Sequence, residues 1–427
     1  MSAASTREAE TLVRRTHSPC PSCTRVLETE IVQRGKELYM RKVCPEHGPF
    51  EVLFKKDAEF YRTVSSLAAP VEPYRGEDAP SCQVSLEHAR IISIDLTERC
   101  NMECPVCFTN ANSRPLEELS KEEILERLAP LQGDRYEVTL LGGEPTLRPD
   151  LPEIIRGILA RGFSIKLISN GLRMEDPAYV RVLKEAGLKW VILQFDGFSD
   201  TIYETLRGQK LLERKLRIIE NLRRADISIC LAVMLVQGVN DHQIADMIRF
   251  GADHSHIHHL AFLPASSIGR DKFNLYPDHL SAEDVIRRME AQTGQRIRER
   301  DFLDTMRLMS RIHRLTGHID FRQRVCFFPL PILGNGSNYV PAVRLLRPAY
   351  LLRHPGAFPR LFFLVRHFFH VDRVDLPAEI TFVTIEKLYN VANLDLSDAK
   401  QCNTLYLTRK GFIPSCMYNS IYRRSCL

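Results

Sequence analysis

Three cysteines close together in the chain are the residues best suited to chemistry. Cys100, Cys104 and Cys107 are separated by three and two residues, in a loop that also contains Asn101 and Pro105. Thiolates at this spacing can wrap around one iron–sulfur cluster, and three of them leave one iron of a four-iron cluster open for chemistry. The alternatives are a zinc site or ordinary buried thiols. Zinc sites favour paired gaps, however, and core thiols have no reason to gather in such a loop.

A second group of cysteines lies near the N-terminus. Cys20 and Cys23 form a Cys-Pro-x-Cys turn, and Cys44 and His47 follow after twenty intervening residues. Such a turn points two sulfurs at one ion, and three thiolates with either His47 or Cys82 would complete a tetrahedral site for iron or zinc. A closed site leaves no room for a substrate, so we expect a structural or electron-transfer role.

A third group of cysteines is scattered over the last hundred residues. Cys326, Cys402 and Cys416, with Cys426 as the least secure member, could hold an auxiliary 4Fe–4S cluster. Their irregular spacing is equally compatible with thiols that bind no metal.

The elements that would position the first three cysteines alternate between strand and helix over residues 89–270. The hydrophobic pattern predicts strands near residues 91–96, 136–141, 164–169, 190–195, 228–236 and 258–263, with a helix after most of them. Alternation of this kind implies a parallel sheet with right-handed crossovers. Six units are fewer than the eight of a closed TIM barrel, so the predicted α/β fold is a partial (β/α)6 TIM-like barrel.

Three further regions surround this predicted barrel. Residues 1–88 form a small cysteine-bearing module of the rubredoxin-like or zinc-ribbon-like kind, residues 271–325 a helical extension, and residues 326–427 an apolar and basic region that carries the third group of cysteines.

Polar residues and glycines directly follow the predicted strands. In parallel βα folds, functional residues lie in the loops at the carboxyl ends of the strands. Gly142 and Gly143, which lack a Cβ, would let a ligand approach the backbone, and Glu144 could accept a hydrogen bond from an ammonium group. The residues that could bind a ribose are Ser169, Asn170, Gln194 and Asp196. Asp196 could instead be a turn former.

The cysteine spacing and the Gly142-Gly143-Glu144 motif resemble the radical SAM superfamily. This resemblance implies that S-adenosylmethionine (SAM) chelates the fourth iron, that Glu144 meets its methionine ammonium and that Val106 lies near its adenine. It also implies reductive cleavage of SAM to a 5′-deoxyadenosyl radical, which abstracts hydrogen from an unactivated C–H bond. Cys100, Cys104 and Cys107 would be the catalytic cluster ligands, and flavodoxin or ferredoxin would be a suitable reductant.

A narrower resemblance extends over most of the chain. The Cys20–Cys23 turn, the Cys44-Pro-Glu-His-Gly run and the Cys416-Met-Tyr-Asn run resemble the group that contains tetraether lipid synthase and the class D radical SAM methylases. The sequence departs from this group in having only Cys82 before the first barrel strand and Asn403 after Cys402. The group implies carbon–carbon bond formation or alkylation, preferably on a lipid chain. The alternatives are methylation of a pterin-like molecule and a non-catalytic iron–sulfur electron-transfer or sensor protein.

The composition indicates which partners and which cellular compartment to expect. The chain has 427 residues, a net charge of +5 and twelve cysteines. The charge is too small to indicate a nucleic-acid partner, and cysteines without a signal segment indicate a reducing cytosol. No run is long and apolar enough to span a membrane. The apolar and basic stretch 344–370 would suit peripheral contact with a membrane surface or a channel for an acyl chain, or else a helix packed on the barrel.

Overall fold

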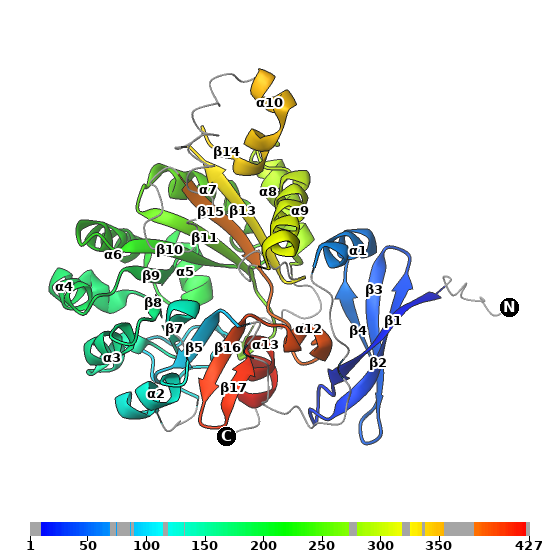
Figure 1. Ribbon diagram of the computed structural model, residues 1–427, viewed down its shortest axis with the longest axis horizontal. Coiled ribbons are helices and arrows are strands. Elements are labelled where there is room, and N and C mark those ends of the chain that lie inside the picture. The colour runs from blue at the N-terminus through cyan, green and yellow to red at the C-terminus, as the bar shows by residue number, and fades with distance from the viewer. Residues whose placement is uncertain are drawn as a thin grey trace.

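The structure is a computed structural model, and the ranges that it describes leave several gaps (Figure 1). The described residues are 10–68, 74, 86, 89–113, 118–131, 133–272, 280–317, 325–334, 338–353 and 380–423. Cys82, Cys426 and most of the apolar and basic stretch therefore lie outside them. No described helix is both long and apolar enough to cross a membrane.

The N-terminal module is a four-stranded antiparallel sheet followed by one helix. Its strands pair in chain order, and they are β1 (Glu10–Pro19), β2 (Val26–Arg34), β3 (Glu37–Cys44) and β4 (Gly48–Lys55). Alternate side chains of β3 point to one face, so Leu38, Met40 and Lys42 are buried whereas Val43 on the opposite face is exposed. Helix α1 (Ala58–Leu67) begins at Asp57, whose carboxylate accepts a hydrogen bond from the Phe60 amide at 2.9 Å.

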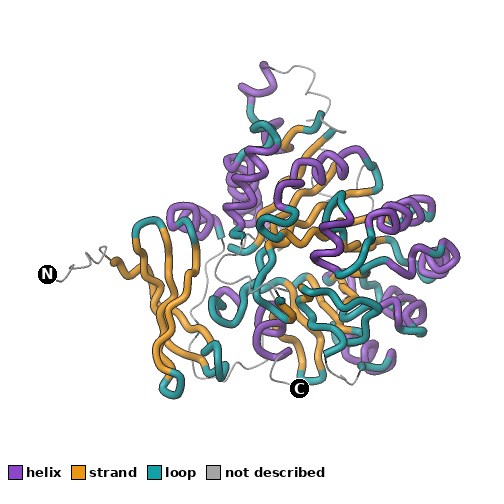
Figure 2. The backbone as a smooth tube through the Cα atoms, turned by 180° about the vertical axis from the view of Figure 1, so that it is seen from behind, coloured by secondary structure: helices purple, strands orange, loops and turns teal. Residues whose placement is uncertain are grey.

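The six predicted barrel strands are confirmed. Each pairs in parallel with the next, and they are β5 (Ile91–Asp95), β7 (Glu137–Leu141), β8 (Ser164–Ser169), β9 (Trp190–Gln194), β10 (Ser228–Leu235) and β11 (Ile257–Pro264). Helices cover the outer side of this curved sheet (Figure 2). They are α2 (Lys121–Leu128), α3 (Leu151–Leu159), α4 (Pro177–Glu185), α6 (Leu212–Arg224) and α7 (Ile244–Asp253). Helix α5 (Asp200–Arg207) instead lies beside the loop with the three cysteines, where Tyr203 packs with Met102.

The sheet extends beyond the six predicted strands. β15 (Ile380–Glu386) adds in parallel to β11, and β16 (Thr404–Thr408) adds in parallel to β5. The antiparallel strands β13 (Phe327–Leu333), β14 (Val340–Pro341) and β17 (Gly411–Pro414) complete the two edges. Among the described residues the eleven strands form one open sheet. The C-terminal region therefore completes both ends of the barrel, which its composition and scattered cysteines did not predict.

The remaining elements link the barrel to its edges. The predicted helical extension contains α8 (Ala282–Gln292), which Ser281 and Asp284 begin with a capping box, and α9 (Glu299–Thr316). The shorter elements are β6 (Val106–Cys107), β12 (Arg270–Asp271), α10 (Pro348–Arg353), α12 (Leu396–Lys400), α13 (Ser415–Met417) and a π-helical turn at Tyr418–Tyr422.

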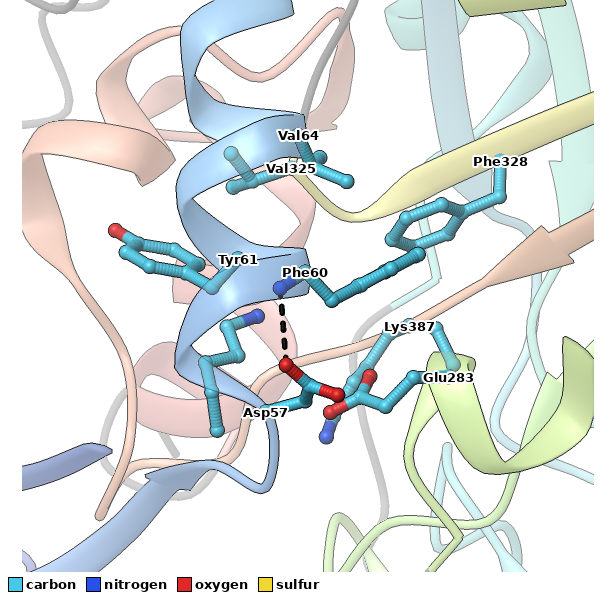
Figure 3. Close-up of a pocket in the computed structure, with 10 residues that line it drawn as sticks. Asp57, Phe60, Tyr61, Val64, Glu283, Val325, Phe328 and Lys387 are labelled. Atoms are coloured by element: carbon cyan, nitrogen blue, oxygen red, sulfur yellow. Dashed lines mark hydrogen bonds between the residues drawn. The ribbon is translucent and has the colours of Figure 1, made fainter. Parts of the chain in front are cut away.

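The N-terminal module packs on the open side of the barrel, away from helices α2, α3, α4 and α6 (Figure 1). Figure 3 shows the junction, where α1 faces β13 and the start of α8 around a small pocket. Phe60 stacks on Phe328 with ring centroids 5.8 Å apart. Lys387 and Glu283 also line the pocket, and both are buried. Burial lowers the pKa of Lys387 to about 7, with the Lys55 charge contributing in the same direction.

Candidate metal and SAM site

The loop with three cysteines leaves the carboxyl end of β5 and is tied down along its length. Asn112 forms two hydrogen bonds with Cys100: its Oδ1 accepts from the backbone amide at 2.8 Å, and its Nδ2 donates to the carbonyl at 3.0 Å. β6, which contains Cys107, pairs with β12, and Arg270 of β12 donates to the Cys104 carbonyl at 3.1 Å. The loop is therefore fixed by residues far away in the sequence.

Two of the three thiols lie in a partly apolar environment. Cys100 and Cys104 pack against Met102, Leu172 and Tyr203, and all three thiols are only partly exposed. Burial raises the pKa of Cys100 to about 12, and the neighbouring Glu144, Cys104 and Cys107 add to that increase. Without metal the thiol is therefore protonated, so binding a cluster must release its proton.

This donor set fits a 4Fe–4S cluster. The thiolates of such a cluster bind different irons, so they stand further apart than the ligands of one ion. Cys104 and Cys107 lie close enough to Cys100 to raise its pKa, so the three thiols belong to one site.

Gly142 and Gly143 lie where another part of the backbone approaches closely. A Cβ at Gly142 would lie 2.3 Å from the Thr97 carbonyl oxygen, and one at Gly143 would lie 2.3 Å from that of Arg99. The Gly143 amide donates to the Thr97 carbonyl at 2.7 Å. The missing side chains thus make room for the backbone that leads into the cysteine loop, and the close approach of a ligand at these positions stays a prediction.

The carboxylate of Glu144 is also occupied by the protein. It is fully buried and accepts hydrogen bonds from Thr146, from the Ser169 hydroxyl at 2.8 Å and from the Asn170 amide at 2.8 Å. Glu144 therefore fixes Ser169 and Asn170, and the Asn170 side chain reaches Cys100 Sγ at 3.9 Å. The expected contact of Glu144 with an ammonium group stays a prediction.

Asp196 pairs with an arginine, and its expected contact with a ribose stays a prediction. Its two carboxylate oxygens accept from the Arg207 guanidinium at 2.7 Å each, and both side chains are almost completely buried. Arg207 also donates to the Val106 carbonyl at 3.3 Å, and its charge opposes the increase that burial imposes on the pKa of Cys104. Asp196 therefore positions a cation beside the cysteine loop.

Gln194 and Asn170 both accept hydrogen bonds from a buried lysine that no sequence pattern pointed to. Lys215 Nζ donates to the Asn170 carbonyl at 2.6 Å and to the Gln194 side-chain oxygen at 2.7 Å. Burial lowers the pKa of Lys215 to about 7. The side-chain amide of Gln194 also donates to Asp196. Strands β8 and β9 and helix α6 are thus joined at the edge where the cysteine loop begins.

A C-terminal arginine joins the two ends of the cysteine loop. Arg423 donates to the Glu98 carboxylate at 3.0 Å and to the Thr109 carbonyl at 3.2 Å, and it also pairs with Asp95. Its guanidinium lies 5.0 Å from the centre of the Tyr418 ring. Sequence reasoning missed Arg423 because more than 300 residues separate it from the loop.

The N-terminal cysteines form a compact four-ligand set. The ligand atoms of Cys20, Cys23, Cys44 and His47 all lie within 4.8 Å of one another, and the Cys23 and Cys44 sulfurs are 3.8 Å apart. Two sulfurs at about 2.3 Å from a tetrahedral zinc would be separated by about 3.8 Å. The geometry therefore fits a single zinc or iron ion with His47 as the fourth ligand, whereas Cys82 lies outside the described residues.

The C-terminal cysteines are less tightly grouped. Cys326 and Cys416 pack in the same apolar cluster as Tyr389, and Cys402 lies between α12 and β16. Among the described residues only the N-terminal set brings three or more ligand atoms within 4.8 Å of one another. An auxiliary cluster at these cysteines stays a prediction.

Known proteins are similar to both cysteine-bearing regions. The model of the radical SAM superfamily matches residues 94–251, and that of the HMPTM N-terminal zinc ribbon domain matches residues 12–56. The chain therefore contains a radical SAM domain, and such a domain holds a 4Fe–4S cluster and binds SAM.

The relatives differ in how much of the chain they match. A 7,8-dihydro-6-hydroxymethylpterin dimethyltransferase of Methanocaldococcus jannaschii is 34% identical over 309 residues, which cover 68% of this chain and 60% of that protein. A probable GTP 3′,8-cyclase of Pyrococcus abyssi is 33% identical over 161 residues, or 37% of this chain and 52% of that protein. The chain thus spans little more than half the length of either relative. The crystal structure of Streptococcus suis SuiB bound to SAM is 16% identical with a TM-score of 0.38 and covers 43% of each chain, too little to support an argument.

Proposed function

We propose that the protein is a radical SAM methyltransferase that acts on a pterin-like small molecule. The observation that carries this proposal is the 34% identity to the pterin dimethyltransferase over 309 residues, which is longer than the radical SAM domain alone. The preferred lipid substrate and the membrane contact have no such support, and most of the stretch that suggested them lies outside the described residues. The non-catalytic alternative has no support from the family either.

The proposed roles of the residues follow from the contacts. Cys100, Cys104 and Cys107 would hold the cluster, and SAM bound there would supply a 5′-deoxyadenosyl radical that abstracts hydrogen from carbon. Glu144 would act through Ser169 and Asn170, and Asp196 through Arg207. The apolar neighbours of Cys100 and Cys104 would exclude water from the site. Cys20, Cys23, Cys44 and His47 would hold a structural ion, because their set is closed.

Two measurements test the proposal. Anaerobic protein with reconstituted iron, SAM and dithionite should yield 5′-deoxyadenosine and methionine. Mass spectrometry of pterins and lipids, extracted from cells with and without the gene, should then show methylated pterins only where the gene is present. Lipids that change while the pterins stay constant would contradict the pterin assignment but leave the class of enzyme intact.

A further inference from the structure

Helix α5 directs two side chains towards the loop with the three cysteines. Tyr203 and Arg207 are four residues apart, so they lie on the same face of the helix. Arg207 donates to the carbonyl of Val106, just before the third cysteine. Tyr203 packs with Met102, which lies between the first two cysteines. The helix therefore contacts both halves of the loop.

The Tyr203 side chain is fixed and shielded from water. It is fully buried, and its ring meets that of Phe195 edge-on, with the centroids 6.3 Å apart. The helix that carries it has defined ends, because the Ser199 hydroxyl caps its first turn and Gly208 ends it in a left-handed conformation. A polar group held in this way has to find its hydrogen-bond partner inside the protein.

The Tyr203 hydroxyl has no hydrogen-bond partner among the described residues. A phenol has one proton to donate. The amides of Asp196 and Gly197 face its oxygen, but amides are donors and cannot take the proton. The Asp196 carboxylate already accepts hydrogen bonds from Arg207 and Gln194. A buried O–H group is thus left without an acceptor, which costs free energy.

Sulfur is the acceptor that the surroundings of Tyr203 offer. The side chains that form one cluster with Tyr203 are apolar except for their sulfur atoms, and they are Met102, Leu172 and Leu211 with the partly buried Cys100, Cys104 and Leu212. Thiols and thioethers are weak acceptors. Cysteines that bind iron lose their protons, and a negatively charged sulfur accepts a stronger hydrogen bond. The hydroxyl therefore gains a strong acceptor only when the loop holds metal.

We propose that Tyr203 donates a hydrogen bond to a sulfur of the iron–sulfur cluster bound at the three cysteines, and that it thereby raises the reduction potential of this cluster. The inference rests on the proposed cluster site and is independent of the substrate. Reduction adds negative charge to the sulfurs, so a donor beside them stabilises the reduced state more than the oxidised state. Tyr203 is thus a residue that tunes the cluster without binding the iron.

Tyr203→Phe tests this inference because it removes the hydroxyl and keeps the ring. The protein is used with its iron reconstituted anaerobically and without SAM, and the potential is measured by an electron paramagnetic resonance titration. We expect about a threefold change in the one-electron equilibrium, equivalent to a potential about 30 mV more negative than in wild type.

The matched control is Tyr136→Phe. Tyr136 is also buried, but it precedes β7 and therefore lies at the amino end of that strand. The cysteine loop leaves the carboxyl end of the neighbouring parallel strand β5, at the opposite edge of the sheet. Tyr136→Phe should therefore leave the potential of the cluster unchanged.

Two further measurements distinguish a hydrogen bond to the cluster from a role in packing. Electron–nuclear double resonance of the reduced cluster should show an exchangeable proton in wild type that is missing in Tyr203→Phe. Before iron is added, the melting temperature of Tyr203→Phe should be no lower than that of wild type, because the hydroxyl then has no acceptor to lose.

The outcomes separate this inference from the cluster assignment. A Tyr203→Phe protein with the potential and the proton signal of wild type would overturn the inference and leave the cluster site standing. A lower melting temperature before iron is added would also contradict it, since the hydroxyl would then have a partner within the protein. Wild-type protein that binds no cluster would overturn both.

Discussion

The two cysteine-bearing regions for which the structure shows a defined site are built in different ways. The N-terminal set takes all four ligands from residues 20–47, which belong to one small sheet. The cysteine loop supplies three thiols, and its supporting side chains include Arg207 and Arg423 from distant parts of the chain. A site whose four ligands are all local can stabilise the small sheet without help from the rest of the chain. A site with an open metal position depends on distant residues to fix its ligands.

Loss of one loop thiol should have the largest effect. Cys104→Ala removes a cluster ligand, so production of 5′-deoxyadenosine from SAM should fall at least about a hundredfold, since even loss of a supporting residue costs 10–100-fold in metal sites. The metal bound at Cys20, Cys23, Cys44 and His47 should be retained, as elemental analysis would show. A variant that kept its yield of 5′-deoxyadenosine would falsify the cluster assignment.

Loss of one N-terminal thiol should lower the metal content and the stability of the protein but leave most SAM cleavage intact. Cys23→Ser opens the closed site, so its metal should be lost and the first thermal transition should fall by about 10 °C, because structural metal binding is folding free energy. Most SAM cleavage should remain, since the supports of the cysteine loop come from the barrel and the C-terminal segment. Activity that fell as far as in Cys104→Ala would show that the two regions are not independent.

A smaller effect should follow when the cation beside the loop is changed. Arg207→Lys keeps the charge but loses the paired contacts with Asp196, so it should weaken hydrogen bonding near Cys104. Because hydrogen bonds near the sulfurs help to set cluster potentials, we expect a shift of about 60 mV towards more negative values, equivalent to tenfold in a one-electron equilibrium. An electron paramagnetic resonance titration measures it. Arg224→Lys, at a surface ion pair with Glu220, should leave the potential unchanged.

The smallest expected effect concerns the junction between the two regions. The pKa of Lys387 is about 7 in the folded protein, below its usual 10.5. Between these values the unfolded chain binds a proton that the folded chain does not, so Lys387 makes stability rise as pH increases from 7 to 10.5. The melting temperature at pH 9 minus that at pH 7 should therefore be smaller in Lys387→Met than in wild type. An equal difference in both proteins would mean that Lys387 does not titrate in this range.

Local patterns in the sequence determined much of this protein. Apolar runs punctuated by capping residues predicted the six barrel strands, because a parallel strand buried beneath helices must be apolar whatever its neighbours are. The spacing of Cys20, Cys23, Cys44 and His47 predicted their grouping, since a turn and a hairpin bring close residues together. The spacing of Cys100, Cys104 and Cys107 predicted a shared loop for the same reason.

Only the tertiary structure decided what the polar side chains at the strand ends do. Glu144 and Asp196 are charged residues at positions suited to a ligand, yet burial requires each of them to be paired, and the folded chain supplies the donors from Ser169, Asn170 and Arg207. The sequence also did not reveal that β15 and β16 pair with the two outermost strands of the barrel, β11 and β5. Such pairing depends on contacts across hundreds of residues, and no local pattern in the sequence records which distant strand will complete a sheet.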